Sequence, residues 1–284
     1  MKIIGVVANL QKPNAAEALK RLARKGKELG LRLVAPDDVA AIIGPGAEPD
    51  LANLIDQIDV LIALGGDGTM LRAVRELKGL DKPVIGVNLG SLGYMTSVTQ
   101  ENLERALECF IKGDFTYTER SIAESVIVRN GHQMAPTRAL NDIVVSTLSQ
   151  RVINLTMSID NEPVGDFVCD GLIVSTPTGS TGHSLSAGGP VLLPTARSLV
   201  VTLICPHTLS TRPLVIPDES TIRIKVDKSS EAKLTTDGQI GTPLVPDDCL
   251  EVRRSRQGVR FIHLPDYSYF AVLRQKLHWR GSIV

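Results

Sequence analysis

A short glycine run with one carboxylate lies in the first quarter of the chain, Gly65-Gly66-Asp67-Gly68-Thr69. It follows an apolar strand pattern at 59–64 and precedes a helical pattern. Glycines let the backbone approach a ligand closely, and the amides that open a helix attract phosphate. Asp67 could hold a metal ion or accept a proton from an attacking hydroxyl. The alternative is a tight turn in which Asp67 only caps the helix.

A second glycine-rich block spans 170–190, with the sequence DGLIVSTPTGSTGHSLSAGGP. A strand pattern leads into a loop dense in hydroxyls and glycines, which suits a ligand with ribose or phosphate groups. The residues from Ser184 could begin a short helix and offer a second N-terminus to an anion. His183 could stack on a base, donate a hydrogen bond or serve a structural role. A solvated surface loop is the alternative, although Pro177 and the final Gly-Gly-Pro indicate a shaped loop.

Three other polar positions have a structural explanation as their first interpretation. Asn141-Asp142 could bind the hydroxyls of a sugar, but a turn before a strand is favoured. Asp237-Gly238-Gln239 is typical of a hairpin turn. Arg72 lies one helical turn beyond Gly68 and could neutralise phosphate charge, although an ordinary solvated arginine is the default.

The chain before residue 118 alternates strand and helix patterns. Strands are predicted at 2–8, 31–35, 59–64 and 83–88, and helices from Asn14 as the cap through 30, at 69–78 and at 100–112, where Gly113 ends the last one. Strands separated by helices indicate parallel βαβ units. We therefore predict an α/β domain over residues 1–118.

The second half reads as many short strands without intervening helices. They are predicted at 122–129, 140–147, 152–159, 172–175, 199–205, 221–226, 250–254 and 259–263, separated by turn signals such as Asn130-Gly131 and Asp160-Asn161. This pattern favours an all-β, sandwich-like domain over 119–266. Residues 267–284 form a tail, helical over 269–279, which we expect to pack back on the N-terminal domain.

Composition excludes several classes of protein. The 284 residues carry 31 basic and 31 acidic side chains, a balance that argues against broad attraction to nucleic acid or to a membrane surface. The four cysteines are scattered and the histidines lack metal-ligand spacing, which indicates reduced thiols and no metal bound directly by protein side chains. We find no signal peptide and no membrane-spanning stretch, and we predict a cytoplasmic location.

Together these motifs closely resemble the NAD kinase family, also called inorganic polyphosphate/ATP-NAD kinases. The matching stretches occur in the family's order, at 65–69, 88–94, 141–142, 170–190, 207–213 and 237–239. The block at 170–190 is the most specific of them. The sequence departs from the family pattern at several positions: for example, Asp142 replaces a glutamate and His183 stands where tyrosine is common.

The resemblance implies a fold, a reaction and a set of partners. The fold is an α/β domain followed by a sandwich-like β domain, in a homodimer or homotetramer. The reaction transfers the terminal phosphate of ATP or polyphosphate to the 2′-hydroxyl of the adenosine ribose of NAD, and Mg²⁺ accompanies ATP. Asp67 is the implied base, and Gly65, Gly66, Gly68 and Thr69 hold the phosphate donor. The predicted NAD-binding residues are Asp67, Gly68, Arg72, Asn141, Asp142, Asp170, Thr181, Gly182, His183, Ser184, Leu185, Ser186 and Gln239.

Two other functions are compatible with part of the pattern. A lipid or sugar kinase could use the same glycine loop, and an assay of alternative acceptors separates it from an NAD kinase. A non-catalytic module that senses NAD(P) would bind dinucleotide without transferring phosphate, and Asp67 argues against it.

Overall fold

The structure is a computed structural model that describes residues 1–90, 93–149, 151–227 and 230–279. The chain divides into two compact units. The first comprises residues 1–119 together with 259–284, and the second comprises residues 120–258. Each unit is built around a hydrophobic core of its own.

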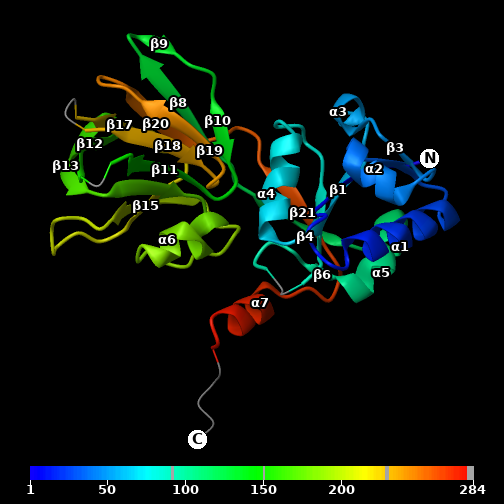
Figure 1. Ribbon diagram of the computed structural model, residues 1–284. Helices are drawn as coiled ribbons and strands as arrows, with labels where there is room; N and C mark the ends of the chain where they lie inside the picture. The colour runs from blue at the N-terminus through cyan, green and yellow to red at the C-terminus, as the bar shows by residue number, and fades with distance from the viewer. Residues whose placement is uncertain (91–92, 150, 228–229, 280–284) are drawn as a thin grey trace, which may run out of the picture. The chain divides into compact units, whose positions relative to one another are not determined.

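The first unit contains a sheet whose central strands are parallel (Figure 1). In sheet order the strands are β3 (Ala47–Glu48), β2 (Arg32–Val34), β1 (Ile3–Ala8), β4 (Val60–Gly65), β5 (Val84–Asn88), β21 (Val259–His263) and β7 (Thr116–Arg120), and β6 (Val98–Thr99) also pairs with β5. The chain leaves β1 toward β2 on one side and returns to β4 on the other. This reversal creates a switch point, and open α/β sheets bind ligands at the carboxyl ends of the strands beside such a point.

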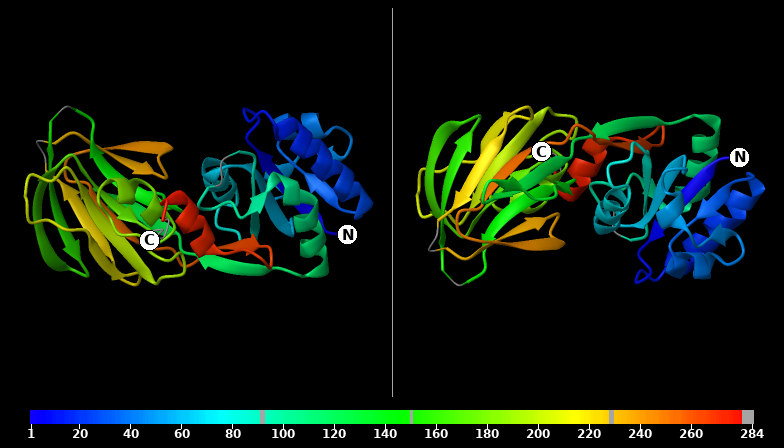
Figure 2. Two further views of the ribbon diagram at one scale, coloured as in Figure 1. Left: turned by 90° about the horizontal axis from the view of Figure 1, so that it is seen from below. Right: turned by 90° about the horizontal axis from the view of Figure 1, so that it is seen from above.

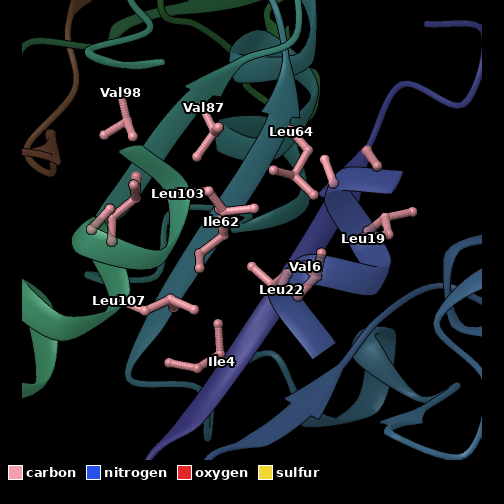
Figure 3. Packing of buried hydrophobic residues seen from close by; sticks show 14 of the residues in the cluster. Ile4, Val6, Leu19, Leu22, Ile62, Leu64, Val87, Val98, Leu103 and Leu107 are labelled. Carbon is pink, nitrogen blue, oxygen red and sulfur yellow. The ribbon is translucent and has the colours of Figure 1, made fainter. Parts of the chain in front are cut away.

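Helices cover both faces of this sheet. α1 (Ala15–Glu28), α2 (Asp37–Ile43) and α5 (Leu103–Lys112) share one core with the sheet, and Figure 3 shows Leu22 and Leu107 beside Ile4 and Ile62. α3 (Leu51–Leu54) and α4 (Asp67–Glu76) lie on the opposite face, where Met70 of α4 packs on Gly86. Because both faces of the sheet are covered by helices, the inner strands are continuous runs of apolar residues, as expected for a parallel sheet.

The predicted helices agree with the structure except at their ends. Asn14 precedes α1, but its side chain makes no capping hydrogen bond. α5 ends at Gly113, whose φ of 74° is left-handed, as the prediction required. α4 begins two residues earlier than predicted, so Asp67, Gly68 and Thr69 form its first turn. The short helices α2 and α3 were absent from the prediction.

Strand β21 marks the main difference from the predicted domain limits. Residues 259–263 were assigned to the β-rich domain, but β21 pairs in parallel with β5 of the first sheet. Four of its five residues are buried, so the strand is apolar enough for either core. α7 (Tyr269–Lys276) follows it and buries Val272 and Leu273 within the first unit.

The second unit is a sandwich of two antiparallel sheets, whose strands lie in two layers in Figure 2. One sheet has the order β10 (Thr137–Ala139), β8 (Ala123–Arg129), β20 (Cys249–Arg254), β17 (Ile222–Val226), β12 (Ile153–Ile159) and β13 (Glu162–Cys169), with β9 (His132–Gln133) paired to β8. The other has the order β16 (Leu214–Pro217), β15 (Ser198–Ile204), β14 (Gly171–Ser175), β11 (Asp142–Thr147), β18 (Ala232–Thr236) and β19 (Ile240–Leu244). The α/β and sandwich fold class predicted from the sequence is confirmed.

Two further observations bear on the expectations from composition. Among the residues that the structure describes, no helix is long and apolar enough to cross a membrane. The four cysteines are free thiols, and Cys109 and Cys169 are buried.

Candidate functional site

The glycine run joins β4 to α4 at the carboxyl edge of the first sheet, beside the switch point. Every residue of β4 is buried, and Gly66 is the N-cap of α4. The Thr69 amide donates to the Gly66 carbonyl at 2.9 Å, whereas the amides of Asp67 and Gly68 begin the helix and have no acceptor one turn before them, so this end of α4 offers donors to an anion. Gly65 and Gly66 therefore stand where the predicted phosphate donor would need close backbone approach.

Thr69 has a packing role in this loop. Its side chain is buried and fills the space where a Cβ on Gly65 would project. The cap position belongs to Gly66, which has no side chain to donate or accept a bond. A direct contact between the Thr69 hydroxyl and a phosphate stays a prediction.

The carboxylate of Asp67 is held by the backbone of a distant segment. Its Oδ2 accepts a hydrogen bond from the amide of Tyr94 at 2.9 Å, and its Oδ1 accepts one from the amide of Met95 at 3.0 Å. The residue remains half-buried, so the carboxylate keeps access to solvent. A carboxylate that is both oriented and accessible can meet a substrate hydroxyl. Nothing in the local sequence pattern indicates these two amides.

Arg72 lies one turn further along α4. Its Nε is 4.0 Å from Glu76 Oε1, and both side chains are more than one third exposed. Such a pair contributes little stability and leaves the guanidinium able to reach other partners. Its role in binding NAD stays a prediction.

In the second unit, Asn141-Asp142 lies where the chain crosses from β10 in one sheet to β11 in the other, and Asp142 is the first residue of β11. The carboxylate of Asp237 accepts hydrogen bonds from the amides of Leu140 at 3.0 Å, Asn141 at 2.7 Å and Asp142 at 3.3 Å. Asp237 and Gly238 have φ values of 50° and 66° and form the hairpin turn between β18 and β19, as predicted. The sequence did not indicate that this turn would also fix Asn141-Asp142.

The loop after β14 packs on the same crossing. The Thr176 amide donates to the Asn141 carbonyl at 2.9 Å, and the Thr176 hydroxyl donates to the Leu140 carbonyl at 2.5 Å. A Cβ on Gly179 would overlap the Asn141 backbone, so only glycine permits this approach. Two stretches far apart in the sequence, 141–142 and 176–183, are thereby brought together.

A pocket of about 370 Å³ opens between these stretches, lined by Asn141, Asp142, Val144, Ser146, His183, Lys233, Thr235, Asp237 and Gly238. Asn141 Oδ1 and, nearby in the loop, Thr178 Oγ1 are buried and have no hydrogen-bond partner among the described residues. Buried polar atoms are normally paired, so unpaired ones beside a pocket point to a polar ligand.

The predicted NAD-binding residues of this loop differ in exposure. His183 and Ser186 are exposed and Thr181, Gly182 and Leu185 are half-buried, at the start of α6 (His183–Ser186). Ser184 is fully buried, and its hydroxyl lies 3.1 Å from that of Thr202 in β15. Ser184 thus helps to pack the loop on the sheet. The other five keep surface that a ligand could contact.

Asp142 has the strongest electrostatic perturbation in this region. Its side chain is buried, and burial together with the nearby charge of Asp237 raises its pKa from 3.8 to about 7. Both effects oppose ionisation. Near neutral pH the carboxyl can therefore act as a donor or as an acceptor toward a ribose hydroxyl.

Asp170 lies apart from the residues of the pocket, and Gln239 directly follows two of them. Asp170 precedes β14, whose five residues rise about 17 Å in all, and Asp142 pairs with Ser175 at the opposite end of that strand. One ribose cannot touch both Asp142 and Asp170 of the same chain. Gln239 is exposed and follows the Asp237-Gly238 turn, with its amide bonded to the carbonyl of Thr236.

The residues present fit a metal ion that arrives with a nucleotide. Within the ranges described, no three His, Cys, Asp or Glu side chains group closely enough to hold a metal ion. Mg²⁺ keeps several waters and is usually bound through one or two carboxylates together with substrate phosphates. Asp67 in the first turn of α4 supplies one carboxylate of this kind.

The glycine loop on an α/β unit and the hydroxyl-rich loop on a β-sandwich are typical of a two-domain, nucleotide-binding phosphotransferase. Comparison with known proteins identifies the family within that class of enzymes. Family models match as the ATP-NAD kinase N-terminal domain over residues 48–115 and as the ATP-NAD kinase C-terminal domain over 140–264.

Curated relatives match over nearly the whole chain. An NAD kinase of Syntrophotalea carbinolica is 38% identical over 98% of this chain and 99% of its own. One of Heliobacterium modesticaldum is 40% identical over the same shares. The chain therefore belongs to the NAD kinase family.

Solved structures agree with this assignment. The yeast NADH kinase complexed with NADH superposes with a TM-score of 0.91 and 27% identity, covering 100% of this chain and 89% of that one. An NAD kinase from Archaeoglobus fulgidus in complex with ATP has a TM-score of 0.77 and 24% identity, covering 98% and 100%. The second likeness supports the fold alone.

Proposed function

We propose that this chain is an ATP-dependent NAD kinase that forms NADP by phosphorylating the 2′-hydroxyl of the adenosine ribose. The observation that carries the proposal is Asp67, a partly exposed carboxylate in the first turn of α4, fixed by two backbone amides in a glycine loop. Membership of the NAD kinase family supports the reaction. The yeast relative crystallised with NADH supports NADH as a second acceptor to assay.

The proposal assigns roles to residues of both units. Gly65, Gly66 and Gly68 bind the phosphate donor through the backbone at the start of α4. Asn141 and Asp142 bind the acceptor ribose, supported by the unpaired Asn141 Oδ1 and the neighbouring pocket. His183 packs on the adenine. The roles proposed for Thr181, Gly182, Leu185 and Ser186 in NAD binding are supported by their accessible surface on the loop that carries His183, and the role proposed for Gln239 by its exposure beside the Asp237-Gly238 turn.

Phosphoryl transfer depends on positioning and charge neutralisation more than on covalent catalysis. Asp67 orients the 2′-hydroxyl and accepts its proton as the oxygen attacks the terminal phosphorus. The bond from that phosphorus to the bridging oxygen of the donor breaks, and ADP leaves. Mg²⁺ bound to the donor phosphates would neutralise their charge, and Asp67, the one carboxylate of the glycine loop, would help to hold it.

The decisive test replaces one carboxylate oxygen. Asp67→Asn keeps the size of the side chain but removes the proton acceptor, so NADP formation from Mg-ATP and NAD should fall at least ~10²-fold. NAD affinity, measured by calorimetry, should stay within ~3-fold because the sandwich residues are unchanged. Diacylglycerol and sugar phosphates serve as alternative acceptors, and inorganic polyphosphate as an alternative donor. Near-normal turnover by the variant would remove Asp67 from the chemistry, and a preference for another acceptor would refute the NAD kinase assignment.

We further propose that the protein self-associates as a homodimer or homotetramer. The separation of Asp170 from Asp142 within one chain supports this, because a second copy could supply Asp170 to the same ligand. Most soluble homo-oligomers have closed symmetry, which would repeat such a shared site in every subunit.

A further inference from the structure

The segment Gly93-Tyr94-Met95 meets Asp67 although 26 or more residues separate them in the sequence. The amides of Tyr94 and Met95 donate to the two different oxygens of the carboxylate. Two such bonds fix both the position of the carboxylate and its rotation. A single bond would leave the carboxylate free to turn about its last torsion.

The approach is possible only because residue 93 is a glycine. A Cβ built on Gly93 would overlap the carboxylate of Asp67, and its three nearest atoms all belong to that group. The requirement at residue 93 is therefore for space beside Asp67.

Buried polar groups hold the segment itself in place. The Thr96 hydroxyl accepts hydrogen bonds from the Gly93 amide at 3.3 Å and from the Asn88 side-chain nitrogen at 3.0 Å, and Thr96 is only 1% exposed. Lys276 of α7 lies 5.9 Å from the centre of the Tyr94 ring on the same unit. Thr96 thus connects the segment to Asn88 at the end of β5. The side chain of Lys276 brings α7 close to the Tyr94 ring.

We infer that Gly93 is a positioning residue for phosphoryl transfer, because its lack of a side chain lets the Tyr94 and Met95 amides clamp Asp67. Displacing a catalytic group by about 1 Å can cost ~10²-fold in rate. A methyl group at residue 93 must move the carboxylate or the segment by at least that distance. The inference rests on the proposed role of Asp67, but it concerns a different residue and has its own measurement.

The test is Gly93→Ala, compared with Gly46→Ala as the matched control. Gly46 belongs to the same unit, and a Cβ there meets its nearest atom at 3.7 Å, an ordinary contact. For Gly93→Ala we expect kcat for NADP formation to fall ~10²-fold or more, while the KM for NAD and its calorimetric Kd stay within ~3-fold. Gly46→Ala should leave kcat and KM within ~2-fold of the wild type.

A second pair of variants decides the question even if Gly93→Ala does not fold. Thr96→Val removes the acceptor for the Gly93 amide while keeping the shape of the side chain, and we expect kcat to fall ~10-fold at unchanged KM. Thr96→Ser restores the hydroxyl and should return kcat to within ~2-fold of the wild type. The inference is overturned if kcat of soluble Gly93→Ala is unchanged, if KM and Kd for NAD worsen as much as kcat, or if Thr96→Ser is no better than Thr96→Val. Absence of NAD phosphorylation by the wild type would instead refute the proposed function.

Discussion

At the scale of single residues, Asp142 shows how one fold gives two neighbouring carboxylates different properties. The two carboxylate oxygens of Asp237 accept hydrogen bonds from three backbone amides. The side chain of Asp142 is buried near the negative charge of Asp237. Burial and the charge of Asp237 raise the pKa of Asp142 to about 7. A carboxyl that titrates near neutral pH costs stability when it ionises, which is compatible with a role in binding a ligand.

Replacing Asp142 by asparagine should therefore change how stability depends on pH. Between about pH 4 and pH 7 the folded wild type holds a proton that the unfolded chain has released, so its free energy of unfolding falls as pH rises and then levels off above pH 7. Asp142→Asn removes this titration. Its stability relative to the wild type should rise over that interval by an amount on the order of 1–4 kcal/mol.

Urea denaturation at pH 5, 6, 7 and 8 measures the effect. Asp56→Asn is the matched control, because Asp56 is an exposed carboxylate and its replacement should follow the wild-type curve. A variant curve parallel to the wild type at every pH would show that Asp142 ionises normally.

The sequence predicted those site residues that lie within a recognisable local motif. Asp67, the Asn141-Asp142 pair and the loop around His183 lie within runs of unusual composition, so their motifs and the family resemblance indicated them. The partners that fix them were missed. The amides of 94–95 lie 27 and 28 residues from Asp67, and Asp237 lies 96 residues from Asn141. Backbone amides have no signature in the sequence, and contacts at such separation exist only once the sheets have formed.

At the scale of elements, turns with two left-handed residues were predicted well because the chemistry is local. Asn130 and Gly131 have φ values of 49° and 78° between β8 and β9, and Asp160 and Asn161 have φ values of 50° and 71° between β12 and β13. Asparagine, aspartate and glycine are the residues that tolerate this conformation. The sequence therefore specifies these hairpins at their tips.

Two of the strands that were missed are edge strands with proline. β13 contains Pro163 and pairs with β12 across a register shift, and β19 contains Pro243. Each lies at the end of its sheet, where one side of the backbone needs no partner strand. Proline argues against a central strand, and the sequence does not show which strands will lie at an edge.

A β-branched residue at a left-handed tip should weaken its hairpin. Asn130→Val places a Cβ-branched side chain at a φ of 49°, and we expect a loss of about 1–2 kcal/mol in the free energy of unfolding. Asn130→Gly, which accepts the same φ, should stay within about 0.5 kcal/mol of the wild type. Chemical denaturation compares the two. Equal stability of both variants would mean that the turn relaxes into another conformation.

At the scale of the whole molecule, the chain enters the sandwich after β7 and returns to the first sheet through β21. β21 lies beside both β5 and β7, which precede the sandwich in sequence. Its composition resembles that of the sandwich strands, so the predicted limit of 266 included it in the wrong unit. Sheet membership is decided by pairing between distant segments, and local patterns do not contain that information.

The position of Asp170 bears on assembly. A dinucleotide that contacts Asp142 and Asp170 of one chain would have to run along β14, from Ser175 to a point before Gly171. A homodimer or homotetramer offers a second arrangement, in which Asp142 of one copy and Asp170 of another serve one ligand. The two arrangements make opposite predictions for mixtures of inactive variants.

Mixing subunits distinguishes them. Asp142→Asn and Asp170→Asn should each lower NADP formation when pure, because each removes a predicted NAD contact. If the site is shared between copies, one of the two sites in a mixed dimer regains both carboxylates, so an exchanged equimolar mixture should recover about a quarter of wild-type activity. If one chain supplies both carboxylates, every site in the mixture lacks one and the activity stays at the level of the pure variants. Each variant taken alone through the same exchange procedure is the control, and size-exclusion chromatography with light scattering reports whether the subunits associate. Undiminished activity of pure Asp170→Asn would exclude Asp170 from the NAD site in either arrangement.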